Sequence, residues 1–192
     1  MQQHAIIDDF LSPTYHKEIL GNLLSPNFAW HYQSNITNID EVDDTDVNQH
    51  GFTHWFLQPG TGMEDTSIAH LVRPLLLQIQ DTIGAKKIIR ARADMTMLAN
   101  KKYVHTPHVD FPFSNISAVY YVNNSDGNTI IYKETTDNPN ADIPEKLTVV
   151  EEVEPIANRL LLFDGFTLHT GSSPIKNKNR ILINSNYQLW KK

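Results

Sequence analysis

Hydrophobic residues recur with helical spacing in two segments of the first half of the chain. The segment 12–24 begins with a serine that can cap a helix and a proline that suits its first turn, and apolar residues then follow three or four positions apart. The segment 65–83 begins with an Asp-Thr cap and keeps a period of about 3.6 residues, with a kink expected at Pro74. The sequence therefore predicts two amphipathic helices.

The pattern changes to strands after Gly84. Short runs that alternate or are continuously apolar, separated by turn signals such as 123–127 and 137–140, predict strands. Three further strands are predicted before Gly84. The full set of predicted strands is 5–10, 28–31, 51–56, 88–98, 116–122, 129–133, 147–153, 159–163 and 180–189.

This order of elements indicates a mainly β fold of the α+β class. Many short strands separated by turns are typical of an antiparallel sandwich or barrel, and the helices precede most of them, so we expect the helices to pack on one sheet. A chain of 192 residues is about one domain. We expect a single domain over 1–192, in which 1–87 supports a β core over 88–190. The acidic segment 34–50 is either a solvated loop or a lid over a site.

Composition excludes several classes of function. The net charge of −6 argues against a nucleic-acid partner, because binding to phosphates depends on clusters of Lys and Arg. The chain has no cysteine, which excludes disulfides, thiolate metal sites and a cysteine nucleophile. It shows neither a secretory signal nor the roughly 18 apolar residues that span a bilayer. We therefore expect a cytoplasmic protein without a membrane partner.

Two histidines and an aspartate offer the most specific chemistry. His108 and Asp110 are two residues apart, so on a strand both side chains point to one face, and His169 could add a third ligand. Two imidazoles and one carboxylate that leave other positions of the metal open are the ligands of non-haem Fe(II) oxygenases. With nine His and fourteen Asp in 192 residues, roughly 0.7 His-x-Asp pairs are expected by chance. The pair therefore needs support from its surroundings.

The surroundings supply an ordered set of motifs. After His108-x-Asp110 come a Tyr-Tyr strand at 118–123, a Pro-x-x-Asn-Arg turn at 155–159 that leads into an apolar strand, His169-x-Gly, and Arg180 eleven positions later. In this order the motifs resemble the Fe(II)- and 2-oxoglutarate-dependent dioxygenases, and most closely their prolyl-hydroxylase-like branch. The resemblance extends over 95–187, and 8–13 resembles the start of the first helix in that branch. It implies a double-stranded β-helix, a jelly roll whose mouth holds the metal.

The resemblance also implies a role for each residue. His108, Asp110 and His169 would hold Fe(II), with 2-oxoglutarate and O₂ at the remaining positions. Arg180 would bind the far carboxylate of 2-oxoglutarate, since a guanidinium forms bidentate, charge-assisted pairs with carboxylates, and Tyr121 matches a tyrosine that supports the same carboxylate. The intact Asp110 favours hydroxylation, because related halogenases lack this carboxylate.

The expected substrate is a peptidyl residue, with proline favoured, or a small amino-acid-like molecule, and the products would include succinate and CO₂. The sequence departs from the branch at 97–100, where prolyl hydroxylases tend to have a tyrosine about ten residues before the His-x-Asp motif. A demethylase of nucleic acid is a second enzyme hypothesis, and the acidic charge argues against it. A cupin-like metal-binding or ligand-binding barrel without turnover is the alternative from another class, and Arg180 distinguishes the two.

Several residues keep two interpretations each. Asn186 either lines the pocket or fills the core or surface, and His105, in a loop near the mouth of the site, either touches the substrate or does not. Arg90, Arg92 and Asp94 alternate along one strand face, which is either a charged exterior or a wall on the substrate side.

Overall fold

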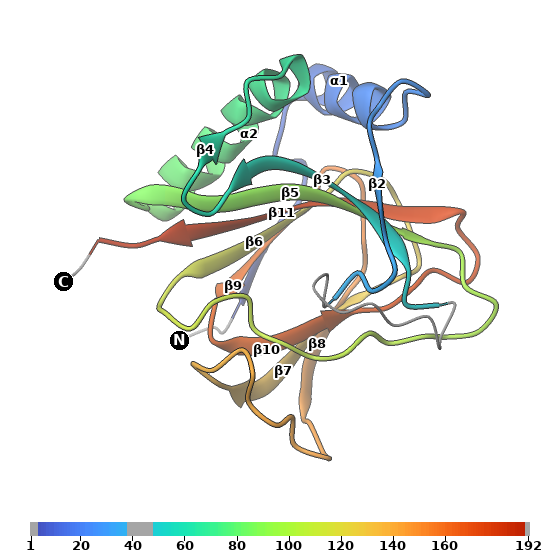
Figure 1. The fold of residues 1–192 in the computed structure, drawn as a ribbon, viewed down its shortest axis with the longest axis vertical. Coiled ribbons are helices and arrows are strands. Elements are labelled where there is room, and N and C mark those ends of the chain that lie inside the picture. The colour runs from blue at the N-terminus through green and yellow to red at the C-terminus, as the bar shows by residue number, and fades with distance from the viewer. Residues whose placement is uncertain (1–3, 38–47, 191–192) are drawn as a thin grey trace.

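The structure is a computed structural model, and it describes residues 4–37 and 48–190. Two antiparallel sheets form the body of the protein (Figure 1). The main sheet contains, in spatial order, β1 (His4–Ile7), β9 (Leu160–Asp164), β6 (Ile116–Tyr121), β11 (Asn179–Gln188), β5 (Lys87–Met97), β3 (Gly51–Gln58) and β2 (His31–Gln33), and β4 (Gly62–Met63) pairs with β3. The minor sheet contains β10 (Thr167–Gly171), β7 (Thr129–Thr135) and β8 (Val149–Val153).

Both predicted helices are confirmed. Helix α1 spans Pro13–Leu23 and helix α2 spans Ser67–Ile83. The hydroxyl of Ser12 caps α1 by accepting from the Tyr15 amide at 3.4 Å, and the hydroxyl of Thr66 caps α2 by accepting from the Ala69 amide at 3.2 Å. Helix α2 ends at Gly84, whose φ of 61° favours glycine. Neither of the helices in the described residues is long and apolar enough to cross a membrane.

The hydroxyl of Tyr15 joins the two helices next to Pro74. It donates to the carbonyl of Leu71 at 2.6 Å and accepts from the amide of Leu75 at 3.1 Å. A proline in a helix removes one backbone donor, and a side chain that inserts into the hydrogen-bond ladder can compensate for the disturbance. The contact therefore fixes α1 against the one turn of α2 where the ladder is weakest. The kink at Pro74 itself stays a prediction.

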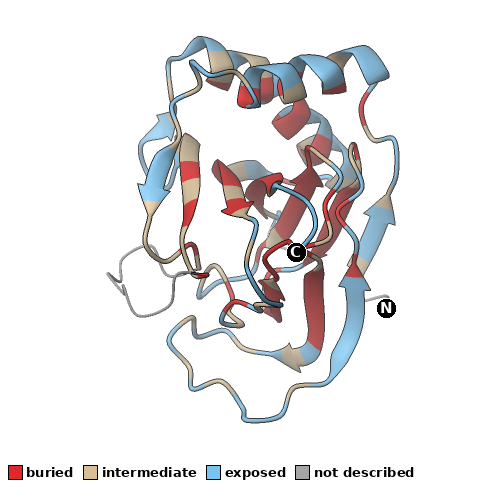
Figure 2. Ribbon diagram, turned by 90° about the vertical axis from the view of Figure 1, so that its right-hand side faces the viewer, coloured by how far each residue is buried: buried red, intermediate tan, exposed pale blue. Residues whose placement is uncertain are grey.

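The main sheet is buried on both faces, and alternate residues of its strands face different layers. On β11, Ile181 and Ile183 pack in the core shared with α1 and α2, whereas Leu182 packs with Ile131 and Val153 of the minor sheet. Figure 1 shows both helices on one face of the main sheet and the minor sheet on the other, and Figure 2 shows the buried interior of the strands between them. The expected mainly β fold with helices packed on one sheet is confirmed.

The two central strands carry polar residues on the face turned toward the minor sheet. Cross-strand pairing places Arg180 opposite Thr96, Leu182 opposite Asp94, Asn184 opposite Arg92 and Asn186 opposite Arg90. All these polar residues are buried. Buried polar rows of this kind cost stability unless they bind partners, so this face of β5 and β11 is the place to look for a site.

The structure differs from the strands expected from the sequence at four places. The strand predicted at 28–31 is wrong, because the strand occupies His31–Gln33, and Phe28 and Trp30 pack on the core ahead of it. Strands β4 and β10 were not predicted, since β4 has two residues and β10 mixes polar and apolar positions. The stretch from His108 to Asp110 is a loop with a single bridge to His169 rather than a strand.

Two expectations on domain organisation remain. Strands β1, β2 and β3 come from 1–87 and lie in the same sheet as β5, so the first part of the chain contributes directly to the core sheet. The division into supporting and core segments stays a prediction. Residues 38–47, which include most of the acidic segment predicted as a loop or a lid, lie outside the described residues.

Candidate metal centre

The backbones of His108 and His169 pair directly with each other. The amide of His108 donates to the carbonyl of His169 at 3.0 Å, and the amide of His169 donates back at 3.1 Å. The two residues are thus a hydrogen-bonded antiparallel pair, whose side chains lie on the same side. Their ring centroids are 4.7 Å apart. A strand was expected to direct these side chains to one face, and the single bridge between His108 and His169 directs both imidazoles to one point instead.

Each imidazole is oriented by a carbonyl two residues earlier in the chain. Nδ1 of His108 lies 3.1 Å from the carbonyl oxygen of Thr106, and Nδ1 of His169 lies 3.0 Å from that of Thr167. A carbonyl oxygen only accepts, so both Nδ1 atoms carry the proton and both Nε2 atoms keep a lone pair, as in metal-binding histidines. Burial also lowers the pKa of His108 to about 4 and lowers that of His169. Both rings are therefore neutral near pH 7.

The carboxylate of Asp110 lies between a polar cluster and an arginine. Its Oδ2 accepts from Nδ2 of Asn186 at 2.9 Å and from Oγ of Ser117 at 3.4 Å, while its Oδ1 lies 2.7 Å from Nη2 of Arg90. Burial alone would raise the pKa of Asp110, but the Arg90 guanidinium and the amide of Asn186 hold it well below its usual range. The side chain is therefore ionised near pH 7.

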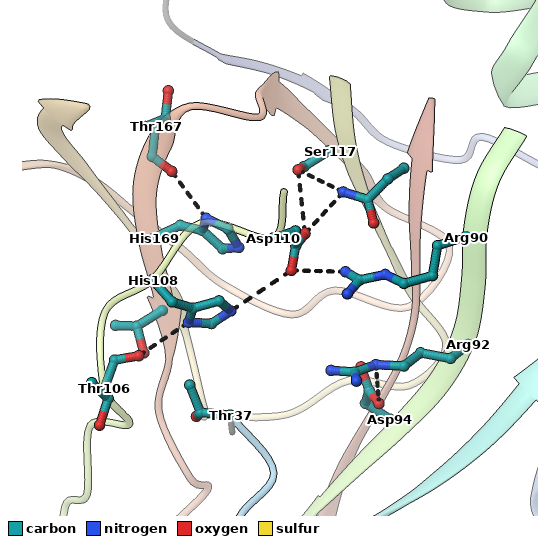
Figure 3. A network of polar contacts seen from close by, with 12 residues as sticks. Thr37, Arg90, Arg92, Asp94, Thr106, His108, Asp110, Ser117, Thr167 and His169 are labelled. Carbon is teal, nitrogen blue, oxygen red and sulfur yellow. Dashed lines mark hydrogen bonds and ion pairs between the residues drawn. The ribbon is translucent and has the colours of Figure 1, made fainter. Parts of the chain in front are cut away.

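The three side chains form a group suited to a divalent transition metal (Figure 3). One ligand atom from each of His108, Asp110 and His169 lies within 4.8 Å of the others, and Nε2 of His108 is 3.9 Å from Oδ1 of Asp110. Neighbouring ligands of one ion lie about 3 Å apart when each metal bond is near 2.1 Å, so shifts of about an ångström would bring all three onto it. The donor set fits Fe(II), because two neutral imidazoles and one carboxylate on one side leave other positions open.

A cavity of about 80 Å³ extends from the two histidines to Arg180. The guanidinium of Arg180 is buried and donates from Nη2 to Oγ1 of Thr129 at 2.6 Å, while its Nε has no hydrogen-bond partner among the described residues. Gly171 makes room for it, because a Cβ at that position would lie 3.2 Å from Nη1 of Arg180. The cavity therefore ends at a buried cation that lacks a full set of acceptors.

Thr129 links Arg180 to Tyr121. The hydroxyl of Tyr121 donates to Oγ1 of Thr129 at 2.6 Å, and its ring lies 5.8 Å from the Arg180 guanidinium. Tyr121 is fully buried and does not line the cavity, whereas Thr129 does. Because Oγ1 of Thr129 accepts two hydrogen bonds, its own proton remains available to donate into the cavity. No sequence motif singles out Thr129, since it begins an ordinary β-strand.

A second cleft, of about 630 Å³, also borders candidate metal ligands. His108 and Asp110 lie at this cleft, together with Arg90, Arg92 and Trp55. Figure 3 shows both guanidinium groups extending from β5 toward the three candidate ligands. Of the two interpretations of the alternating charged face, the charged exterior is wrong, because Arg90, Arg92 and Asp94 are buried beside the candidate metal ligands. The wall on the substrate side stays a prediction.

The remaining residues singled out in the sequence also have definite places. His105 is buried beside Ser173, with Nε2 3.1 Å from Oγ, and lines the Arg180 cavity. Asn186 is buried and lines neither cavity among the described residues, because its amide holds Asp110 instead. Its part in the site follows from a contact 76 residues apart in the chain, which no local pattern shows.

Several solved structures have a similar fold. A prolyl hydroxylase from Trichoplax adhaerens, in complex with a hypoxia inducible factor oxygen degradation domain peptide fragment, aligns over 98% of this chain and 84% of its own, with a TM-score of 0.69 and 15% identity. An oxidoreductase of the 2OG-Fe(II) oxygenase family from Burkholderia pseudomallei aligns over 97% and 85%, with a TM-score of 0.67 and 10% identity.

A third structure has a different reaction. The epimerase SnoN, in complex with Fe3+, alpha ketoglutarate and nogalamycin RO, aligns over 97% of this chain and 79% of its own, with a TM-score of 0.66 and 11% identity. No protein-family model matches the sequence, and no curated protein matches it. The chain thus has the double-stranded β-helix fold of the 2-oxoglutarate- and Fe(II)-dependent oxygenases, as the resemblance implied, and a His-Asp-His candidate metal site at the mouth of that fold.

Proposed function

We propose that this protein is an Fe(II)- and 2-oxoglutarate-dependent oxygenase that hydroxylates a C–H bond of a peptidyl residue, with proline favoured, or of a small amino-acid-like substrate. In such a reaction one atom of O₂ enters the substrate as a hydroxyl group, and the other enters 2-oxoglutarate, which becomes succinate and CO₂. When bound, Fe(II) with 2-oxoglutarate and O₂ supplies an oxidant strong enough to break an unactivated C–H bond.

One observation carries the proposal. The His108, Asp110 and His169 side chains come together beside a cavity that is lined by the two histidines and by the Arg180 guanidinium. A five-carbon diacid needs a cation at its far carboxylate and a metal at its keto-acid end, and this cavity offers a place for both. The proton of Thr129 would add a hydrogen bond to that carboxylate, and Tyr121 would hold Thr129 and Arg180 in place.

The residues of the chain perform the remaining tasks. The carbonyls of Thr106 and Thr167 keep the two imidazoles in the tautomer that binds a metal, and the Asn186 amide orients the carboxylate of Asp110. The cleft lined by Arg90 and Trp55 would give a substrate an approach to the metal, and Arg92 and His108 border both this cleft and the Arg180 cavity.

The alternative is a cupin-like barrel that binds a metal or ligand without turnover. Such a barrel has no need of a buried guanidinium at the end of a cavity, and Arg180 therefore favours the oxygenase. A demethylase of nucleic acid is disfavoured by the net charge of −6.

The test is an anaerobic titration of the Fe(II)-loaded protein with 2-oxoglutarate. The visible charge-transfer band of an Fe(II)–keto-acid chelate is expected for the unaltered protein and not for His108→Ala. Succinate should then form on addition of O₂, even without substrate, at a low rate. Bound iron without any band would exclude the oxygenase and favour the barrel without turnover.

A further inference from the structure

The cleft beside the candidate metal ligands carries more positive charge than its own residues neutralise. The described residues that line the cleft and the adjoining cavity include the three guanidinium groups of Arg90, Arg92 and Arg180 but only two carboxylates, Asp94 and Asp110. A divalent metal and the dianion of 2-oxoglutarate would cancel each other. One positive charge then remains in excess over the whole group, and burying such a charge is costly unless a ligand supplies the opposite one.

Arg92 is the cation best placed to receive that ligand. Its Nε is 2.9 Å from Oδ1 of Asp94, so one edge of the guanidinium is held from behind. Its two terminal nitrogens form no hydrogen bond within the described residues, and the residue lines the cleft. A guanidinium held in this way presents two parallel N–H groups, which match the two oxygens of a carboxylate.

The surroundings keep this group rigid and add charge behind it. The Trp55 ring lies 5.5 Å from the Arg92 guanidinium, and the two residues are directly opposite on β3 and β5. Arg90, one position along the same strand face, lies 5.1 Å from the Phe111 ring, and its Nε has no hydrogen-bond partner in the described part of the chain. Both arginine side chains are about nine-tenths buried. Cations stacked on aromatic rings lose little further freedom when they bind an anion.

We propose that the cleft recognises the α-carboxylate of its substrate through Arg92, with Arg90 adding positive charge. This inference rests on the proposed function and narrows its substrate class. The substrate is a free amino acid or the last residue of a peptide, because an internal peptide residue has no α-carboxylate to offer. The carboxylate at Arg92 orients the molecule so that its side chain lies toward His108 and Asp110, which border the same cleft.

The experiment measures binding in the anaerobic protein loaded with Fe(II) and 2-oxoglutarate, so that nothing turns over and the Arg180 cavity is filled. The probes are the twenty L-amino acids and their α-amides, followed by N-acetyl tripeptides with an acid or amide end, and the readout is isothermal titration calorimetry. At least one acid should bind with a Kd below about 1 mM, and its amide should bind at least about 30-fold more weakly, as expected for loss of a buried charge pair. The tripeptides then distinguish a free amino acid from a peptide end.

The variant that tests the residue is the double substitution R92Q/D94N. It removes the cation together with its partner, so it leaves no unpaired buried charge and should fold. Acid binding should fall to the level of the amide, and amide binding should not change. Arg92 and Asp94 also line the Arg180 cavity, so 2-oxoglutarate affinity is measured for the same variant, and it should stay within about threefold of the unaltered protein because Arg180 and Thr129 are intact. Arg73→Gln, which removes an exposed arginine on α2, is the matched control and should change none of these values.

Three outcomes would overturn the proposal: no acid that binds with a Kd below about 1 mM, equal binding of acid and amide, or unchanged acid binding in R92Q/D94N. Loss of 2-oxoglutarate binding in that variant would assign Arg92 to the cosubstrate and would overturn it as well. Failure of the proposed function looks different, because the unaltered protein would then show no charge-transfer band with 2-oxoglutarate. The same acid and amide titrations on the Fe(II) protein alone would still test Arg92.

Discussion

Replacing Arg180 with methionine should have opposite effects on stability and on ligand binding. The guanidinium is only 6% exposed, it donates a hydrogen bond to Thr129, and its Nε has no partner in the described residues. It forms no salt bridge within 4.0 Å to any carboxylate in the part of the chain that the structure describes. Methionine has a similar length and no charge, so it can fill the same space beside Gly171.

The magnitudes follow from these contacts. A buried polar group without a partner costs about 1–3 kcal/mol, and the hydrogen bond to Thr129 returns about 1 kcal/mol of that. Arg180→Met should therefore raise the free energy of unfolding of the metal-free protein by about 1 kcal/mol, or Tm by about 2–4 °C for a chain of this size. Truncating one member of a buried charge pair costs about 2–5 kcal/mol, so 2-oxoglutarate should bind roughly 30-fold to several thousand-fold more weakly.

Thermal unfolding followed by circular dichroism gives the first value, and anaerobic titration of the Fe(II) protein gives the second. Arg159→Met is the matched control, because Arg159 already has a carboxylate partner, with Nε and Nη2 at 2.6 and 3.0 Å from Asp8. It should lower stability by at most about 1 kcal/mol and leave 2-oxoglutarate binding unchanged. A lower Tm for Arg180→Met together with unchanged 2-oxoglutarate affinity would refute the reasoning, since Arg180 would then be a structural residue.

Three further predictions concern other parts of the molecule. Asn186→Ala should weaken Fe(II) binding by about 10–100-fold in a metal titration, and Ser117→Ala, with its longer contact, should do less; equal effects would contradict the geometry. In the metal-free protein, the stability measured by urea unfolding should fall as pH drops from about 6.5 toward 4, because burial lowers the pKa of His108 to about 4 and the unfolded chain takes up the proton first. His108→Asn should flatten this part of the pH profile, and an unchanged slope would show that His108 is not the cause. Asn158 has a φ of 67°, and its side-chain oxygen and nitrogen bind the Leu11 backbone at 2.9 and 2.8 Å. Asn158→Gly and Asn158→Ala both lose these hydrogen bonds, but only alanine adds the cost of a positive φ, so the alanine variant should be about 1 kcal/mol less stable than the glycine variant in thermal unfolding. The reverse order would show that φ is not the reason.

The helices and the metal ligands could be predicted from the sequence because each depends on short-range rules. Capping residues and a period of 3.6 located both helices to within two residues of their observed ends. The spacing of His108 and Asp110 predicted a shared direction for their side chains, although the reason given for it was wrong. A bridge to His169 and carbonyls two residues earlier set the directions in the absence of a strand.

The Pro-x-x-Asn-Arg turn and the segment 8–13 were recognised separately, and the structure explains both by a single contact. Asn158 clamps the backbone of Leu11, and Arg159 pairs with Asp8. The two motifs are thus halves of one structural joint between the start of the chain and the core sheet. A sequence shows each half, but only the fold shows that they meet, because the partners are 147 and 151 residues apart.

The fold itself orients the metal-binding side chains, whereas a buried cation of the site needs a bound anion to balance its charge. Backbone carbonyls and the Asn186 amide orient the metal ligands, so metal binding has little side-chain freedom left to remove. The Arg180 guanidinium is different, because no carboxylate of the described residues lies within 4.0 Å of it and full compensation of its burial requires an anion in the cavity. Metal binding alone adds to this positive charge. It follows that 2-oxoglutarate should stabilise the metal-loaded protein against unfolding more than it stabilises the metal-free protein, and the difference in the shift of Tm would measure how strongly metal and cosubstrate are coupled.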